Sequence, residues 1–486
     1  MYESCSISGY LAGEPQEFRE FIFRGMSTRG KKLAEPFESG TTSSVYGPTN
    51  ELIERLDKNP DPKGESGVHV SEEWISAALD VFKGIFIIFM LTEHTRSGFS
   101  MKMTSGEPIM QFVSQVACSL DMTCFSTAYG FSCYRSYLTN SKGRSMKSQL
   151  WRLFRSIGLI SAAAWACNVS FELAVLQNPP TWESMRKIFT FDVVYWDFLT
   201  TFPAMLLTAF VTTKPLMTIA SKSPNQFVRL SIFAVLIIWP LLASNWALDT
   251  CPTALDRYKA IFMGCVRRTL GAMRFSAFTY MFYFNFGCIV SMLTLEHSKS
   301  GAKPSVSMRD ILTKPHWIAY GVLLAIELYY ALPIFQEYNR SWEYLNWEGY
   351  RRFPMTAPLT LAWGFMSQSV GVLALVLTAI VRPQVLKLSS SIQHVFRNTI
   401  GVACKVLEHF GANVLLYLTV SNIVIHAFFN IDWRRFQIAN GKSAGKGKNT
   451  DLAYSIRQWE YVVVAAAIGQ ILFVQLLSYM IRSSRK

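Results

Sequence analysis

The sequence lacks the short motifs that mark several common classes of protein. Neither a GxxxxGK[ST] loop nor a GxGxxG segment occurs, so no phosphate-binding signature is present. The nine cysteines never fall in CxxC or CxxH spacing, which gives no support to a zinc site or a disulfide framework. No segment repeats with a period of 20–50 residues, and residues 1–72 contain no apolar core of a signal peptide. These absences argue against several soluble classes but identify no function.

Charged residues are also scarce, at 16% of the chain, whereas half of the residues are hydrophobic. This balance is typical of a polytopic membrane protein. The net charge of +14 comes from basic residues scattered through short loops, so we expect no nucleic-acid partner. Residues 135–155 carry Arg135, Lys142, Arg144, Lys147, Arg152 and Arg155 without an acid between them. The positive-inside rule explains such a loop; attraction of a phosphorylated cofactor such as acyl-CoA is the alternative.

Windows of about twenty residues predict an all-α bundle of about ten transmembrane helices in contact with membrane lipids. The expected spans are 75–93, 109–133, 153–176, 192–212, 228–248, 274–295, 316–335, 357–381, 411–430 and 460–481. Residues 1–72 form a polar N-terminal extension that a partner or a membrane surface would order, and residues 73–486 form the integral domain. Basic residues near both ends place the termini on the cytoplasmic or matrix side, although the basic loop 431–459 argues the other way.

The first expected span carries ionisable residues along one face. Lys83 and His94 are eleven residues apart, so at about 100° per residue they lie nearly in line, and Asp80 falls on the same stripe. Ionisable groups on a membrane helix are costly and are usually functional. His94 is a candidate general base; alternatively it is an interfacial His bonded to a loop carbonyl. Asp80 and Lys83 can instead neutralise each other at i and i+3.

Asp121 lies in the middle of the second span, between Leu120 and Met122. An acid at that depth indicates either a polar interior or a buried pair with a basic residue of another span. Further ionisable residues interrupt later spans, namely Asp192, Asp197, Arg274, Glu327, Glu408, His409 and His426. Together they predict that the bundle encloses a polar site.

Five segments, in order, resemble the acyltransferase-3-like superfamily of membrane proteins. Leu79-Asp80-x-x-Lys83-Gly84 followed by His94 resembles the L-D-x-x-R-G…H pattern of its first helix. The other four segments are 125–138, 192–199, 274–287 and 407–418, which end in or contain Arg135, Asp192, Gly287 and Gly411. The superfamily includes OpgC-type and OafA-type proteins and, more distantly, heparan glucosaminide acetyltransferases.

The resemblance implies transfer of an acyl group, acetyl in the simplest case, from acyl-CoA to a hydroxyl of a sugar or lipid acceptor. It implies catalytic roles for His94, Asp80 and Asp121, and contacts of Lys83, Arg135 and Arg144 with the acyl-CoA donor, without a metal.

The chain also departs from the family pattern. Lys83 stands where the family has Arg, Tyr129 where it has Ser, and Ala412, Val414 and Val420 replace polar positions of the last segment. These departures leave open a catalytically inactive scaffold subunit of a larger membrane complex, for example in the mitochondrial inner membrane or another organelle. A transporter or channel is a third reading, but no inverted pair of broken spans occurs.

Overall fold

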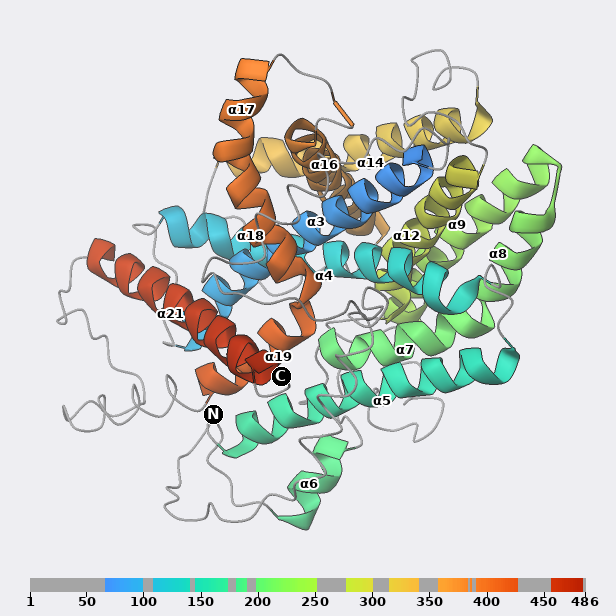
Figure 1. Ribbon diagram of the computed structural model, residues 1–486. Coiled ribbons are helices and arrows are strands. Elements are labelled where there is room, and N and C mark those ends of the chain that lie inside the picture. The colour runs from blue at the N-terminus through green and yellow to red at the C-terminus, as the bar shows by residue number, and fades with distance from the viewer. Residues whose placement is uncertain are drawn as a thin grey trace, which may run out of the picture.

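The computed structural model describes most of the integral domain, as residues 66–98, 108–139, 145–173, 181–189, 198–250, 277–299, 314–340, 357–382, 385–386, 390–426 and 456–483. These ranges are almost entirely helical and contain no strand. Figure 1 shows long helices crossing one another at varied angles around a shared interior. The all-α prediction is confirmed for the described residues. Residues 1–65, most of the predicted N-terminal extension, lie outside them.

Six of the described helices are long and apolar enough to cross a membrane, which makes the chain a multi-pass membrane protein. The segments are Glu73–Thr95 of α3 (Ser66–Gly98), Met146–Phe171 of α5 (Met146–Phe171), Gln226–Trp246 of α9 (Gln226–Thr250), Ala277–Glu296 of α12 (Ala277–Lys299), Pro315–Ile334 of α14 (Pro315–Arg340) and Ala357–Val381 of α16 (Ala357–Val381). Each coincides with one of the ten spans expected from the sequence.

A bent pair of helices makes a seventh crossing if its two members form one broken span. α7 (Phe198–Val211) and α8 (Thr213–Lys222) meet at an angle of 46°. Pro215 in the first turn of α8 explains the break, because proline has no N–H and its ring clashes with the carbonyl four residues earlier, here that of Val211. The predicted span 192–212 covers α7 alone and ends at the bend, so the sequence windows missed α8.

Three of the ten expected spans fall on helices that, over the described residues, do not combine the length and apolar composition needed to cross a membrane. One is α4 (Pro108–Cys133), which continues into the π-helical turn η2 (Tyr134–Leu138). Another is divided at Asn413 between α18 (Ile400–Ala412) and α19 (Val414–Val424). The third is α21 (Ile456–Ser483), whose described apolar stretch is Ala465–Leu477. The count of about ten spans is thus not confirmed, although the described residues of each predicted span are almost all helical.

Pairs of glycines allow two helix pairs to approach backbone to backbone. A Cβ on Gly84 of α3 would lie 2.1 Å from the carbonyl oxygen of Leu407, and one on Gly411 of α18 would lie 1.8 Å from that of Asp80. Because the carbonyl four residues before a helical residue accepts its N–H, these contacts are mutual: the two glycines face each other where the helices cross. Close approach through small residues is characteristic of membrane helices.

The same arrangement recurs between α4 and α12. A Cβ on Gly130 would lie 2.0 Å from the Phe284 oxygen, and one on Gly287 would lie 2.0 Å from the Thr127 oxygen. Beyond this crossing the Cys288 thiol donates to the Gly130 carbonyl, 3.3 Å away. These two helix pairs have the most extensive contacts of the described structure.

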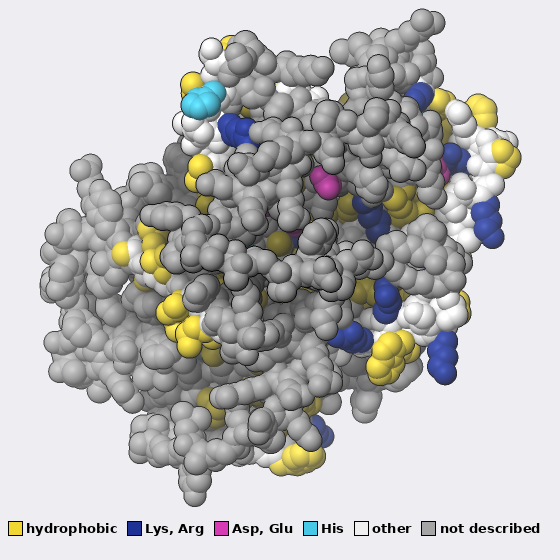
Figure 2. Space-filling model, viewed as in Figure 1, with side chains coloured by type: hydrophobic (Ala, Val, Ile, Leu, Met, Phe, Trp, Pro, Cys, Tyr) yellow, Lys and Arg dark blue, Asp and Glu magenta, His cyan; other side chains and the backbone are white. Residues whose placement is uncertain are grey.

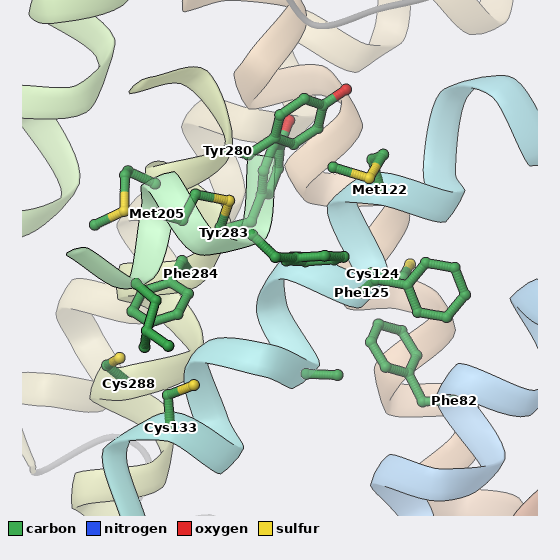
Figure 3. Packing of buried hydrophobic residues seen from close by; sticks show 14 of the residues in the cluster. Phe82, Met122, Cys124, Phe125, Cys133, Met205, Tyr280, Tyr283, Phe284 and Cys288 are labelled. Atoms are coloured by element: carbon green, nitrogen blue, oxygen red, sulfur yellow. The ribbon is translucent and has the colours of Figure 1, made fainter. Parts of the chain in front are cut away.

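Aromatic and sulfur-containing side chains fill the space around the crossings. Figure 3 shows Phe82 beside Phe125, and Tyr283 and Phe284 near Met205. Five described cysteines, Cys124, Cys133, Cys167, Cys288 and Cys404, are buried and form no disulfide. Outward helices instead expose large apolar side chains, among them Ile318 and Val322 of α14, as lipid-facing helices do.

The glycine crossings predict a steric effect of alanine. Gly84→Ala or Gly411→Ala forces α3 and α18 apart, so we expect the free energy of unfolding to fall by roughly 1–3 kcal/mol. Gly158→Ala and Gly469→Ala are matched controls, because a Cβ there meets nothing within 4 Å. Thermal denaturation of the detergent-purified variants measures the difference. Equal midpoints in all four variants would contradict the close crossing.

Two smaller remaining helices, α6 (Trp182–Phe189) and α17 (Ser390–Asn398), lie at the periphery of the bundle in Figure 1. α6 contacts α5, and α17 contacts α16 and α18.

Candidate functional site: a polar cluster around His94

His94 lies near the end of α3 and contacts α19. Its Nδ1 is 2.7 Å from the Oδ1 of Asn422. Since an amide oxygen only accepts, Nδ1 carries the proton and the lone pair of the neutral ring is on Nε2. His94 is partly buried. The alternative of an interfacial His bonded to a loop carbonyl does not describe this contact, because the partner is a side-chain amide within another helix.

A second imidazole lies near the first. His426, just after α19, has its Nδ1 2.9 Å from Oγ of Ser170 in α5. The Ser170 hydroxyl donates its only proton to the Cys167 carbonyl, 2.8 Å away, so His426 is the donor to Ser170. This proton arrangement does not make Ser170 a nucleophile activated by His426. The charges of His94 and His426 interact, which places the two rings in one neighbourhood.

Further polar side chains are buried in the same helices, close in sequence to these residues. Glu93, Asn168 and Glu172 are 6%, 6% and 2% exposed, and each has interactions of its own. Gln470 of α21 is 4% exposed and donates to the Thr95 hydroxyl at 2.8 Å. We call these residues, together with His94, Asn422, Ser170 and His426, the His94 cluster. It lies where α3, α5, α19 and α21 meet, and buried polar groups of this density are unusual in an apolar bundle.

Asp80 and Lys83 lie far from this cluster. Lys83 Nζ is 2.6 Å from Asp80 Oδ1, with side chains 15% and 24% exposed respectively. The expectation of mutual neutralisation is confirmed. Fourteen residues of helix separate Asp80 from His94, or roughly 21 Å at about 1.5 Å per residue. The stripe read from the sequence is therefore divided between the middle of α3, where Asp80 and Lys83 lie, and its C-terminal end, where His94 lies.

Arg135 also lies away from His94. Its guanidinium is near two hydroxyls of α12, with Nε 3.3 Å from Ser291 Oγ and Nη2 3.4 Å from Thr294 Oγ1, and it stands 4.7 Å from the centre of the Phe131 ring. α3 and α4 run in opposite directions (Figure 1), so Arg135, just past the end of α4, lies toward the start of α3. The structure thus separates His94, the predicted acceptor-activating residue, from Lys83 and Arg135, two of the predicted donor-binding residues.

Two predicted site residues cannot be placed. Asp121 belongs to α4, but its side chain lies outside the described residues. Arg144 also falls outside them. In Figure 2, Lys and Arg side chains gather at the side of the molecule where Figure 1 draws α8 and the beginning of α5. The first part of α5 contributes Lys147, Arg152 and Arg155 to that side. We call this side the basic end of the bundle.

Several polar residues of the interior were missed from the sequence. Asn422 and Ser170 are small polar residues inside apolar segments, and only their helical neighbours reveal their partners. Lys214 in the broken crossing is 8% exposed, and its Nζ lies 2.6 Å from Gln149 Oε1 and 4.3 Å from the centre of the Phe210 ring. A basic residue next to Pro215 within an apolar segment was the signal that could have identified it.

Comparisons of the chain with protein-family models, with curated proteins and with solved structures find no match. Within the described ranges, no group of three or more His, Cys, Asp or Glu is placed to hold a metal ion. The function is therefore argued from the His94 cluster and from the chemistry of its side chains.

The contact between His94 and Asn422 predicts energetic coupling. A double-mutant cycle combines His94→Ala with Asn422→Ala. We expect the double variant to lose about 0.5–1.5 kcal/mol less unfolding free energy than the two single losses added together, because either single change removes the same hydrogen bond. Thermal or denaturant unfolding in detergent measures the cycle. A cycle between His394, on exposed α17, and Asn422 is the control. Additive losses for His94 and Asn422 would show that the bond contributes nothing.

The Asp80–Lys83 ion pair near the middle of α3 predicts a second non-additive effect. Asp80→Asn or Lys83→Met alone leaves one half-buried charge without its partner, whereas the double variant removes both charges. We expect the double variant to be more stable than the weaker single variant, measured by the midpoint of thermal denaturation. A double variant whose loss equals or exceeds the sum of the single losses would contradict this reading.

Proposed function

We propose that the chain is a membrane-bound acyltransferase that moves an acyl group, most simply acetyl, from acyl-CoA to a hydroxyl of a sugar or lipid acceptor. The observation that carries the proposal is the His94–Asn422 contact within a buried polar cluster of an otherwise apolar bundle. Asn422 fixes the tautomer in which Nε2 carries the lone pair, and a general base needs such a fixed ring nitrogen.

The chemistry assigned to His94 is proton transfer. Nε2 accepts the proton of the acceptor hydroxyl while the oxygen attacks the thioester carbon. A new C–O bond forms, the C–S bond breaks, and the proton passes to the departing thiolate of coenzyme A. Asn422 bonded to Nδ1 positions the ring and stabilises the imidazolium that forms transiently, the role an orienting group has in other His-based sites.

The helix crossings add support from a different direction. Gly84, Gly130, Gly287 and Gly411 belong to four of the five segments that resemble the acyltransferase-3-like superfamily, and these glycines face one another in two pairs. Segments far apart in the chain that share a family pattern are thus also packing partners. This supports a common architecture more strongly than it supports a common reaction.

The donor side of the proposal rests on the basic end of the bundle. Acyl-CoA carries phosphates, which basic side chains attract, and its thioester would extend from that end toward His94. Lys83 is neutralised by Asp80, and Arg135 is engaged by α12. Both lie apart from the His94 cluster, so in this proposal neither acts on the reacting carbonyl.

The same separation favours the alternative function, a catalytically inactive scaffold subunit of a larger membrane complex. A scaffold would retain the glycine crossings and the Asp80–Lys83 pair, because both hold helices together. It would have no need of a ring nitrogen poised at His94, so the two proposals differ in what His94 does.

An acetyl-transfer assay distinguishes them. Native membrane vesicles that contain the protein supply lipid and glycolipid acceptors. The assay measures how much more thiol these vesicles release from acetyl-CoA than vesicles without the protein. We expect His94→Ala to reduce this release at least 100-fold, because general-base catalysis contributes about 10²–10⁴-fold. The exposed His394→Ala on α17 is the matched control and should retain the wild-type rate.

A stable, correctly inserted His94→Ala protein with the wild-type rate would remove His94 from the mechanism. Wild-type vesicles that release no more thiol than empty vesicles would favour the scaffold.

A further inference from the structure

A carboxyl group lies in the middle of a membrane-spanning helix, well apart from the His94 cluster in the sequence. Glu327 is near the centre of the candidate span Pro315–Ile334 of α14. Its side chain is 0% exposed, whereas its neighbours Ile326 and Leu328 are 44% and 36% exposed. α14 therefore turns apolar side chains outward and the carboxyl inward, toward α16. An acid held at this depth is costly unless it has a purpose.

α16 is shaped to receive this carboxyl. Gln368 Nε2 donates to Glu327 Oε1 at 2.8 Å. One turn earlier, a Cβ on Gly364 would lie 2.6 Å from the same Oε1 and 3.2 Å from the carboxyl carbon. Only glycine leaves room for the carboxyl at that position. The amide that binds Glu327 and the glycine that accommodates it lie on one face of α16, four residues apart.

Two acceptor oxygens of this pair have no donor. Glu327 Oε2 and Gln368 Oε1 are both buried and neither has a hydrogen-bond partner. None of the ion pairs among the described residues includes Glu327. The titratable groups that interact with it are Tyr283 of α12 and Tyr320 of α14, and the Tyr283 hydroxyl already donates to the Thr360 carbonyl at 2.7 Å. The missing partner is thus a hydrogen or a cation.

The ligand count decides between these two occupants. Calcium takes about six to eight oxygen ligands and magnesium about six, whereas this pair offers one carboxyl and one amide. An ionised carboxylate without a cation would be an unpaired charge in an apolar interior, which is far costlier than the neutral acid. A single proton on the carboxyl removes the charge and supplies a donor where two acceptors lack one.

We propose that Glu327 and Gln368 form a proton-binding site inside the membrane, in which Glu327 holds a proton at neutral pH between α14 and α16. The proton is the ligand, Gln368 is the residue that positions the carboxyl, and Gly364 provides the space. The site uses none of the residues assigned to acyl transfer, so its test is independent of that function.

Infrared spectroscopy of the full-length protein in lipid nanodiscs tests the site directly. A protonated carboxylic acid and a carboxylate have separate carbonyl bands. We expect the wild-type spectrum at neutral pH to contain a protonated-acid band that Glu327→Gln removes and that Gln368→Leu shifts, since Gln368 donates to the carboxyl. Glu296→Gln, at the half-exposed pair with Arg229, is the matched control and should leave the band unchanged.

Three outcomes would overturn the proposal. The first is a wild-type spectrum without a protonated-acid band at neutral pH. The second is a band that persists in folded Glu327→Gln protein. The third is a band that sodium or potassium chloride abolishes at constant pH, because the site would then bind a metal cation instead.

A second measurement serves if Glu327→Gln does not fold. Dicyclohexylcarbodiimide partitions into membranes and reacts with protonated carboxyls: the acid proton goes to a carbodiimide nitrogen and the carboxyl oxygen bonds to its central carbon. Mass spectrometry of the treated wild-type protein should locate the adduct on Glu327 at neutral pH, with labelling reduced at least several-fold in alkaline buffer. Absence of the adduct at Glu327, with other carboxyls modified, would contradict a protonated Glu327.

Discussion

The close crossing of α3 and α18 at Gly84 and Gly411 determines where the other parts of the bundle lie. With carbonyl oxygens at the positions that a Cβ would need, the two helices are fixed in depth and in rotation relative to each other. His94, ten residues beyond Gly84, and Asn422, eleven beyond Gly411, then meet on the same side of the crossing. The α4–α12 crossing at Gly130 and Gly287 does the same for Arg135 and the hydroxyls of α12. In a membrane, where apolar burial does not drive helices together, such backbone contact supplies dispersion and weak C–H···O bonding.

Polar groups enter this interior at several places, and three of them bear on function. The His94 cluster lies at the C-terminal end of α3 and the Asp80–Lys83 pair lies near the middle of that helix, while Glu327 and Gln368 join α14 to α16. The three differ in how their polar atoms are satisfied. The ion pair is internally neutral, the imidazoles have defined donors and acceptors, and the Glu327 pair has acceptors without a donor. Only the last two arrangements leave chemistry to be done, proton transfer in one and proton binding in the other.

The fold was largely predictable from hydrophobic windows, because the length of an apolar segment alone decides whether it can span a membrane. The windows missed two features of the spans: the span 192–212 stops at the bend and leaves out α8, and the turn at Asn413 lies within the predicted span 411–430. Helical periodicity correctly placed His94, Lys83 and Asp80 on one stripe, because it gives the angle of a residue around the helix axis. It does not show that the residues are close together: about 21 Å of helix separates Asp80 from His94. Asn422, Ser170 and Lys214 escaped notice because their role depends on partners from distant segments.

Under the proposed function, acyl transfer occurs at the His94 end of the bundle. Photo-crosslinking measures where the acyl chain of the donor lies. The wild-type protein in lipid nanodiscs is irradiated with an acyl-CoA analogue that carries a diazirine in its acyl chain, and the adducts are mapped by mass spectrometry. We expect adducts near the end of α3 and in α19 or α5, close to His94, Asn422 and Ser170, and we expect excess acetyl-CoA to suppress them. Adducts confined to the basic end around Arg135, or adducts that acetyl-CoA does not suppress, would contradict this expectation.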